Sequence, residues 1–183
     1  MNANTVALLI LTVAAPLGAF DVIYYHLWKF RLYARPESRP ETVTHLLRGL
    51  LIGCGAILLA YGEPHGVWFW IVSAVFVIDF LNDIADVILE PKSRKSLGGL
   101  PPLEYLTHIM GAGAAAAATS GFIVLAYPWS TLPTEIAPAH EVPRWLAING
   151  YIMGIGGLLL EGFETVLFIR ARPSVVAKAK TSA

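Results

Sequence analysis

The sequence contains a single cysteine, Cys54, few charged residues, and no excess of charge of either sign. One cysteine excludes an intrachain disulfide, so cysteine usage does not identify the redox compartment. A formal net charge of +0 at pH 7 argues against nucleic acid as a partner. Only 14% of the residues are charged and 56% are hydrophobic, which is too apolar for an ordinary soluble domain. The composition therefore predicts an integral membrane protein in contact with the lipid bilayer.

Five stretches of the sequence are long enough to cross a bilayer, which takes roughly 20 helical residues. They lie at about 4–29, 43–61, 66–90, 102–127 and 144–169. The first stretch lacks the basic segment of a signal peptide and stays apolar up to Tyr24 and Trp28, so we interpret it as a retained span. We expect an all-α protein with a single domain at 1–172, a bundle of five transmembrane helices, and a disordered cytoplasmic tail at 173–183.

Basic residues are concentrated on one side of these spans. If the N-terminus is outside, only Arg144 lies on the outer side, and twelve basic residues lie on or near the cytoplasmic side. These twelve are Lys29, Arg31, Arg35, Arg39, Arg48, Lys92, Arg94, Lys95, Arg170, Arg172, Lys178 and Lys180. The positive-inside rule thus predicts an outer N-terminus and a cytoplasmic C-terminus. We expect a multi-pass protein of a bacterial inner (plasma) membrane.

An acidic stripe of four carboxylates interrupts the third apolar stretch: Asp79, Asp83, Asp86 and Glu90. Their spacings of 4, 3 and 4 residues place them within an arc of about 60° on a helix. A charge at the centre of a membrane helix costs roughly 2.5–3.5 kcal/mol or more, so such acids normally face the bundle interior and mark function. We therefore expect the acidic stripe to face the other helices.

The other spans carry polar residues at a similar depth. Asp21, His108, Glu161 and the stripe residue Asp83 each lie about 10–13 Å along a helix from its cytoplasmic end. His26 is an exception, because five residues of a straight α-helix separate it from Asp21 by about 140°. Most of the polar residues should therefore meet in one layer, whereas His26 should not point to the same place as Asp21.

Small residues accompany the acids on two of these helices. Glu104 and His108 share a helix face with Gly111, and Glu161 and Glu164 share one with glycines near residue 157. Small residues let helices approach closely in lipid, so these faces should be packed inside the bundle. The same faces could also support a homo-oligomer.

The spans contain far more acids than bases. Eight acids lie within them: Asp21, Asp79, Asp83, Asp86, Glu90, Glu104, Glu161 and Glu164. Arg48 is the one base near them, although Glu104 is favoured by its place in the first helical turn and Glu90 can reach Lys92 or Arg94. The remaining acids need protons or a bound metal to neutralise them. A protonated proton-transfer network and a purely structural polar core are the alternatives to a metal cluster.

Carboxylate and imidazole ligands together suit iron, manganese or zinc, and the lack of an aligned thiolate argues against a structural zinc site. The mixture is similar to that of di-iron carboxylate enzymes, but their Glu-x-x-His element is absent and so are paired histidine boxes, so no family is inferred. We favour a dinuclear iron centre, with zinc or manganese as alternatives. The expected ligands are Asp83, Asp86, Glu104, His108, Glu161 and Glu164, then His45 and Asp21, with Asp79 as a deeper ligand or proton carrier. Arg48 should hold a ligating acid in place.

Such a centre near the cytoplasmic side predicts an oxidoreductase or oxygenase acting on a lipid-soluble small molecule. A transporter of metal ions or protons would need a polar route past its site. The outer halves of the spans offer little beyond Ser73, Thr119 and Ser120, which favours the enzyme. An accessory or structural subunit of a larger membrane complex is the third possibility. On the outer side, His65 and His140 are better explained by exposed polar loops than by a second metal site.

Overall fold

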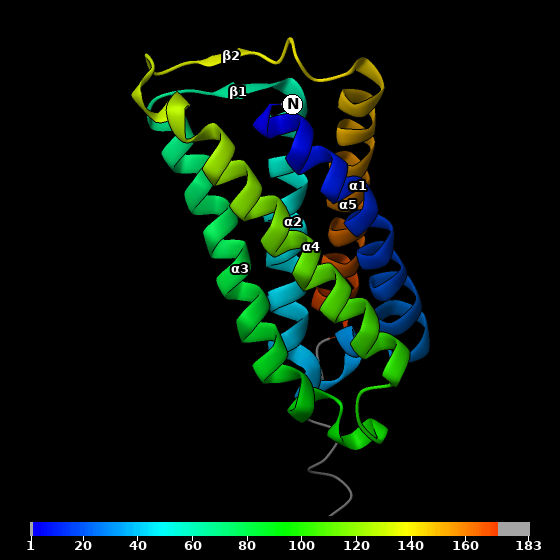
Figure 1. Ribbon diagram of the computed structural model, residues 1–183. Coiled ribbons are helices and arrows are strands. Elements are labelled where there is room, and N and C mark those ends of the chain that lie inside the picture. Colours follow the sequence, from blue (N-terminus) through cyan, green and yellow to red (C-terminus); the bar gives the residue numbers. More distant parts are fainter. Residues whose placement is uncertain (1, 172–183) are drawn as a thin grey trace, which may run out of the picture.

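The computed structural model describes residues 2–171, so the predicted tail at 173–183 lies outside the described residues. Within that range five long helices run up and down in sequence order (Figure 1). They are α1 (Ala3–Phe20), α2 (Arg39–Tyr61), α3 (Val67–Ser93), α4 (Pro102–Ala126) and α5 (Arg144–Arg170). The predicted helical class is confirmed, and each of the five helices coincides with one of the predicted apolar stretches.

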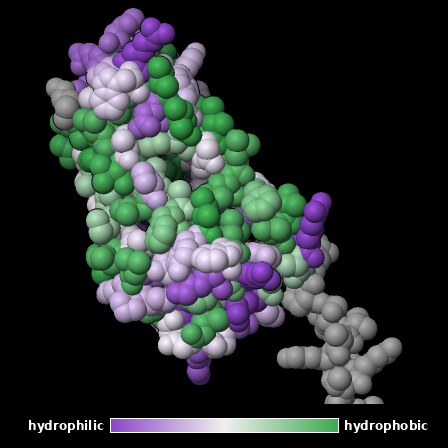
Figure 2. Space-filling model, turned by 90° about the vertical axis from the view of Figure 1, so that its right-hand side faces the viewer, coloured by the Kyte–Doolittle hydropathy of each residue, from purple (hydrophilic) through white to green (hydrophobic). Residues whose placement is uncertain are grey.

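Among the described residues, four segments are long and apolar enough to cross a membrane: Ala3–Lys29, Pro36–Tyr61, Pro102–Thr131 and Arg144–Arg170. The helix that is not among them is α3, which carries the acidic stripe. A fifth span at α3 therefore stays a prediction, as does the orientation of the bundle. The surface nevertheless has the pattern of a membrane protein, with an apolar band between two more polar ends (Figure 2).

Short elements connect the long helices. A π-helix, η1 (Asp21–Lys29), continues α1, and two 3-10 turns, η2 (Leu32–Ala34) and η3 (Pro36–Ser38), lead into α2. Between α3 and α4 the chain forms η4 (Lys95–Leu97), and η5 (Tyr127–Thr131) follows α4. Proline lies in the first turn of both α2 and α4, where its missing N–H costs no helical hydrogen bond.

A small β-ribbon covers one end of the bundle, next to the start of α1 (Figure 1). Its strands β1 (Gly62–Pro64) and β2 (Ile136–Pro138) are antiparallel, with Gly62 opposite Pro138. Gly66 makes the turn from β1 into α3 with φ +57°, a conformation that glycine adopts without strain. The opposite end of the bundle holds the α1–α2 and α3–α4 connections, and we call it the connection end.

The apolar core fills the half of the bundle near the β-ribbon. It is built around large side chains from all five helices: Leu8, Leu59, Phe69, Phe76, Phe122 and Leu146. The half near the connection end contains the buried acids and histidines instead. The two halves are therefore chemically distinct, and the side chains that could bind a metal or react lie in the polar half.

Candidate metal centre

Asp21 and His26 come together because the chain changes from α-helix to π-helix between α1 and η1. At the end of η1 the Phe30 N–H donates to the Tyr25 carbonyl at 2.9 Å, which is the i→i+5 bond of a π-helix. Residues five apart therefore share a face, and His26 Nε2 lies 3.4 Å from Asp21 Oδ2, with both residues buried. The expectation that the two side chains diverge is wrong, because it assumed a straight α-helix.

The first turns of α2 and α4 repeat one motif, Glu-x-x-Thr-His. It reads Glu41 to His45 on α2 and Glu104 to His108 on α4. In each copy the threonine hydroxyl donates to the carbonyl of the motif's glutamate, at 2.6 Å in α2 and 2.7 Å in α4. The i,i+4 spacing puts glutamate and histidine on the same helix face. Two helices thus present the same pair of side chains to the bundle interior.

Arg94 joins the two glutamates of this repeat. Its Nη1 donates to Glu41 Oε2 at 2.7 Å and its Nε donates to Glu104 Oε1 at 3.0 Å, and all three residues are fully buried. Burial alone would lower the pKa of Arg94, but the carboxylates of Glu41 and Glu104 outweigh it and raise that pKa. The sequence assigned Arg94 to a cytoplasmic loop as a partner for Glu90; in the structure it is an interior cation.

The histidines of the repeat bind other carboxylates. His108 Nε2 lies 3.0 Å from Asp21 Oδ2, and its Nδ1 contacts Glu90 Oε1. His45 Nε2 lies 3.0 Å from Asp86 Oδ2, and the rings of His45 and His26 are 4.0 Å apart between centroids. Side chains from η1, α2, α3 and α4 therefore meet around the imidazoles.

Among residues 2–171, three groups of side chains have ligand atoms within 4.8 Å of one another, as a bound metal requires. The groups are Asp21, His26, His45 and His108; Glu41, His45 and Asp86; and Asp86, Glu90 and His108. We call these seven residues the ligand cluster. Asp86, His45 and His108 each belong to two of the three groups. Two ions bound in different groups would therefore have to share a ligand residue.

Many buried carboxylate oxygens in this half accept no hydrogen bond from the described residues. They are Asp21 Oδ1, Glu41 Oε1, Asp79 Oδ1, Glu104 Oε2, Glu161 Oε2 and both oxygens of Glu164. An unsatisfied buried polar group costs about 1–3 kcal/mol, and more when it is charged. Free oxygen donors beside imidazoles are the donor set that iron, manganese or zinc takes. Two of these oxygens, Asp21 Oδ1 and Glu41 Oε1, belong to the ligand cluster, which therefore fits a transition metal chemically.

Four of the nine predicted ligands fall within the ligand cluster: Asp21, His45, Asp86 and His108. Asp83 and Glu104 do not, because Asp83 contacts Arg48 and Glu104 contacts Arg94. Arg48 does hold a carboxylate of the stripe, but that carboxylate belongs to none of the three groups. Asp79 is buried about one turn further along α3, also outside the groups.

Glu161 and Glu164 of α5 lie beside the ligand cluster rather than in it. Gly49 of α2 makes room for Glu161, because a Cβ atom at Gly49 would overlap the Glu161 side chain. Glu164 is fully buried, with Oε1 4.0 Å from His26 Nδ1. Neither side chain belongs to a group that could ligate one ion directly in the described conformation.

Sequence reasoning left out three members of the cluster: His26, Glu41 and Glu90. The signal for Glu41 was the repeated Glu-x-x-Thr-His motif, which would have marked it as the counterpart of Glu104. Glu90 belongs to the predicted acidic stripe, but it was assigned to a basic partner in the loop. The only signal for His26 was its spacing of five residues from Asp21, which is meaningful only in a π-helix.

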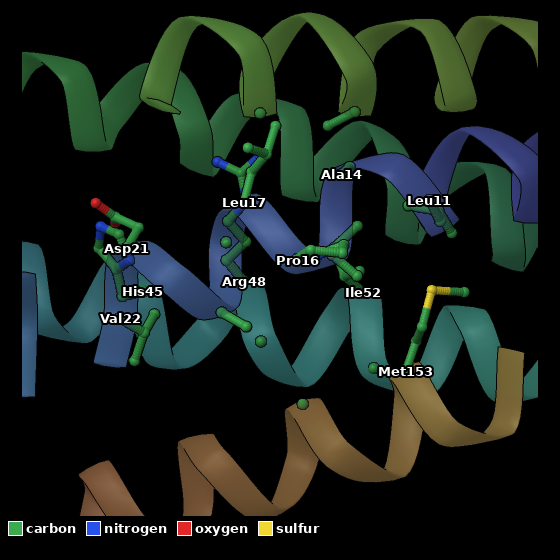
Figure 3. A pocket seen from close by; sticks show the side chains of 18 of the residues that line it. Leu11, Ala14, Pro16, Leu17, Asp21, Val22, His45, Arg48, Ile52 and Met153 are labelled. Atoms are coloured by element: carbon green, nitrogen blue, oxygen red, sulfur yellow. The ribbon is translucent and has the colours of Figure 1, made fainter. Parts of the chain in front are cut away.

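A cavity of about 600 Å³ extends from the ligand cluster toward the middle of the bundle, and all five long helices line it. Asp21 and His45 lie at one end of the view in Figure 3, and Leu11 and Met153 lie at the other. Its walls between these ends are mostly apolar, with Pro16 and Ile52 among them. The arrangement combines a polar end with a long apolar body.

The fold and the site together define a class: a helical bundle of membrane-spanning length with an internal carboxylate and histidine cluster at one end of an apolar cavity. Comparison with protein-family models, with curated proteins and with solved structures gave no match. The class therefore rests on the bundle, the cluster and the cavity.

Proposed function

We propose that this chain is an integral membrane protein that holds a transition-metal centre in the ligand cluster and serves as an oxidoreductase or oxygenase on a lipid-soluble molecule bound in the cavity. The observation that carries the proposal is the convergence of carboxylates on His26, His45 and His108 in the ligand cluster, where the buried Asp21 Oδ1 and Glu41 Oε1 accept no hydrogen bond from the described residues. Carboxylate–imidazole sites of this kind hold redox-active metals in helical bundles. The adjoining apolar cavity supplies the place for an apolar substrate.

The balance of charge supports a metal over a network of ion pairs. Nine carboxylates lie in or next to the cluster: Asp21, Glu41, Asp79, Asp83, Asp86, Glu90, Glu104, Glu161 and Glu164. Among the described residues the guanidiniums that contact them are those of Arg48 and Arg94. Even with all three imidazoles protonated, acids remain in excess. A divalent cation, or two, would reduce that excess, so that fewer acids need to be protonated.

Iron is the ion that we propose, with zinc or manganese as alternatives. A bound iron would supply one-electron chemistry to a substrate in the cavity. The protein side chains would fix its position: Asp86 and Glu90 lie against the imidazoles of His45 and His108, and Arg94 holds Glu41. The apolar cavity walls would keep bulk water away from the reacting atoms. Glu164 is placed to accept or release a proton beside His26.

Transport is less well supported, because the apolar core separates the cavity from the β-ribbon end. The half of the bundle near the β-ribbon contains more polar residues than the three named from the sequence, since Asn4, Thr12 and Asn149 also lie there. The Asn149 amide donates to Thr12 Oγ1 at 2.7 Å, and the Asn4 amide donates to two backbone carbonyls. These amides are bonded locally rather than arranged as a path. Vesicles containing the protein should therefore show no metal-dependent ion flux.

Elemental analysis of the purified protein tests the proposal. We expect bound iron in the wild type and a large loss of it in His45→Ala and in His108→Ala, since each histidine belongs to two of the three groups. His140→Ala is the matched control, because His140 is exposed near the β-ribbon, outside the cluster, and should leave metal content unchanged. All variants should first be shown to elute as monodisperse protein.

The outcomes discriminate among the alternatives. Zinc in place of iron would favour hydrolytic chemistry. Absence of any metal from protein grown with ample iron, zinc and manganese would refute the metal centre and favour a protonated network or a structural subunit. Full occupancy in both His45→Ala and His108→Ala would place the metal elsewhere. Saturable metal uptake by vesicles would make transport the better interpretation.

A further inference from the structure

The cavity has the size and lining of a site for one apolar chain. Its volume of about 600 Å³ lies within the roughly 300–1,000 Å³ that small-molecule pockets occupy. The walls toward Leu11, Ile52 and Met153 are apolar apart from Thr12 and Asn149, which hydrogen-bond to each other. An elongated hydrocarbon chain would replace water along these walls.

The polar end of the cavity selects the head group. Asp21, Asp86 and Glu90 line it together with His45 and His108, so carboxylates outnumber imidazoles there. Even with two divalent ions bound, the nine carboxylates of this half exceed the positive charge of the metals, Arg48 and Arg94, so an anionic head such as a carboxylate or phosphate would be repelled. A hydroxyl group would instead donate a hydrogen bond to one of them.

Arg48 does not change this preference for an uncharged head. It is the one arginine that the described residues contribute to the cavity wall, and its Nη1 contacts Asp83 Oδ1. A guanidinium that already pairs with a carboxylate offers little net charge to an incoming anion. Among residues 2–171 the lining contains no lysine, so no other permanent cation of the described chain faces the cavity.

We infer that the cavity binds an uncharged, single-chain lipid with a terminal hydroxyl, its head beside Asp21, His45 and His108 and its chain toward Leu11 and Met153. The inference deepens the proposed function, on which it rests for the chemistry at the head, and it names the substrate class. The head group would lie beside the proposed metal, and the apolar end would lie near the middle of the bundle. The lining residues Ile23 and Ile152 are exposed on the outside of the bundle, so such a molecule would enter there from the membrane.

Glycines in the wall give a direct means of filling the cavity. Gly111, Gly156 and Gly157 line it, and a Cβ atom at any of them would meet no other atom within 4 Å. Leucine at such a position would occupy space that the lipid chain needs without displacing a neighbouring side chain. Gly113 on α4 and Gly162 on α5 are equally open but do not line the cavity, so they are matched controls.

The test uses photoreactive analogues of a long-chain alcohol and of the fatty acid and the amine of the same length, added to the purified full-length protein. Labelled peptides are located by mass spectrometry, and iron is measured in the same samples. We expect the alcohol to label cavity-lining segments of α1, α2 and α5, with competition by unlabelled alcohol and little labelling by the acid. Gly157→Leu should reduce labelling about tenfold, because chain contacts with the wall are lost. Gly162→Leu should label like the wild type.

Each result decides the inference separately from the metal centre. Equal labelling by the acid, or stronger labelling by a long-chain amine, would overturn the uncharged head group. Labelling that both Gly157→Leu and Gly111→Leu leave unchanged, in variants that elute like the wild type, would overturn the cavity as the site. Labelling with the expected pattern in protein without iron would support the lipid site and refute the proposed metal function. Bound iron in protein that the alcohol does not label would support the metal centre and refute the lipid site.

Discussion

Arg94 offers the sharpest test of how the polar half is held together. Its replacement by alanine leaves the Glu41 and Glu104 carboxylates fully buried without the cation that they share. Removing one partner of a buried ion pair costs about 3–5 kcal/mol. In a chain of this length each kcal/mol lowers the melting temperature by about 2–4 °C, so Arg94→Ala should melt roughly 6–20 °C below the wild type.

Thermal unfolding in detergent, followed by circular dichroism, measures this effect. Lys95→Ala is the control, since Lys95 is exposed next to Arg94 and should melt like the wild type. Adding Glu41→Gln and Glu104→Gln to Arg94→Ala should recover much of the loss, because no unpaired charge remains. The loss should also shrink at acidic pH, where protons neutralise the orphaned carboxylates. If Arg94→Ala has the same melting temperature as Lys95→Ala, the buried ion pairs are refuted.

Two further predictions test packing and topology. Gly49→Ala should destabilise the protein by about 1–3 kcal/mol in chemical unfolding, because the new methyl group overlaps the Glu161 side chain. Adding Glu161→Ala should remove most of that cost. If the effects of the two substitutions simply add, the close approach of Gly49 and Glu161 is contradicted. Gly18→Ala is its control, since a Cβ atom there meets nothing within 4 Å. Reporter fusions after residue 97 should report cytoplasm and fusions within 130–140 the outer side; the opposite pattern would place the ligand cluster near the outer leaflet.

The sequence predicted the helices and the interior position of the acidic stripe because both depend on regular periodicity. Apolar stretches of about 20 residues have few alternatives to a helix, and the stripe of α3 is buried as its spacing requires. His26 could not be placed in this way. Its position depends on the change to a π-helix at Asp21, and the rule of 100° per residue fails wherever the hydrogen-bond pattern changes.

The sequence also could not predict which basic side chain each buried acid contacts. Asp83, Asp86 and Glu104 look equivalent in a list of membrane carboxylates, yet Asp83 contacts Arg48, Asp86 lies against His45, and Glu104 contacts Arg94. Which acid meets a guanidinium depends on how a connection folds back into the bundle. Arg94 follows the end of α3, and no helical spacing rule predicts that such a residue becomes fully buried.

The shared contact of Glu41 and Glu104 with Arg94 fixes how α2 and α4 are positioned relative to each other along the bundle axis. Each histidine of the repeated motif follows its glutamate by four residues, or about 6 Å of helix, so both imidazoles are measured from the same cation. Sliding either helix by one residue would break its contact with Arg94 before it could separate His45 from His108. The connection from Arg94 to Glu104 should therefore tolerate insertions poorly, whereas the loop between η5 and β2, at the far end, can change length without moving either histidine.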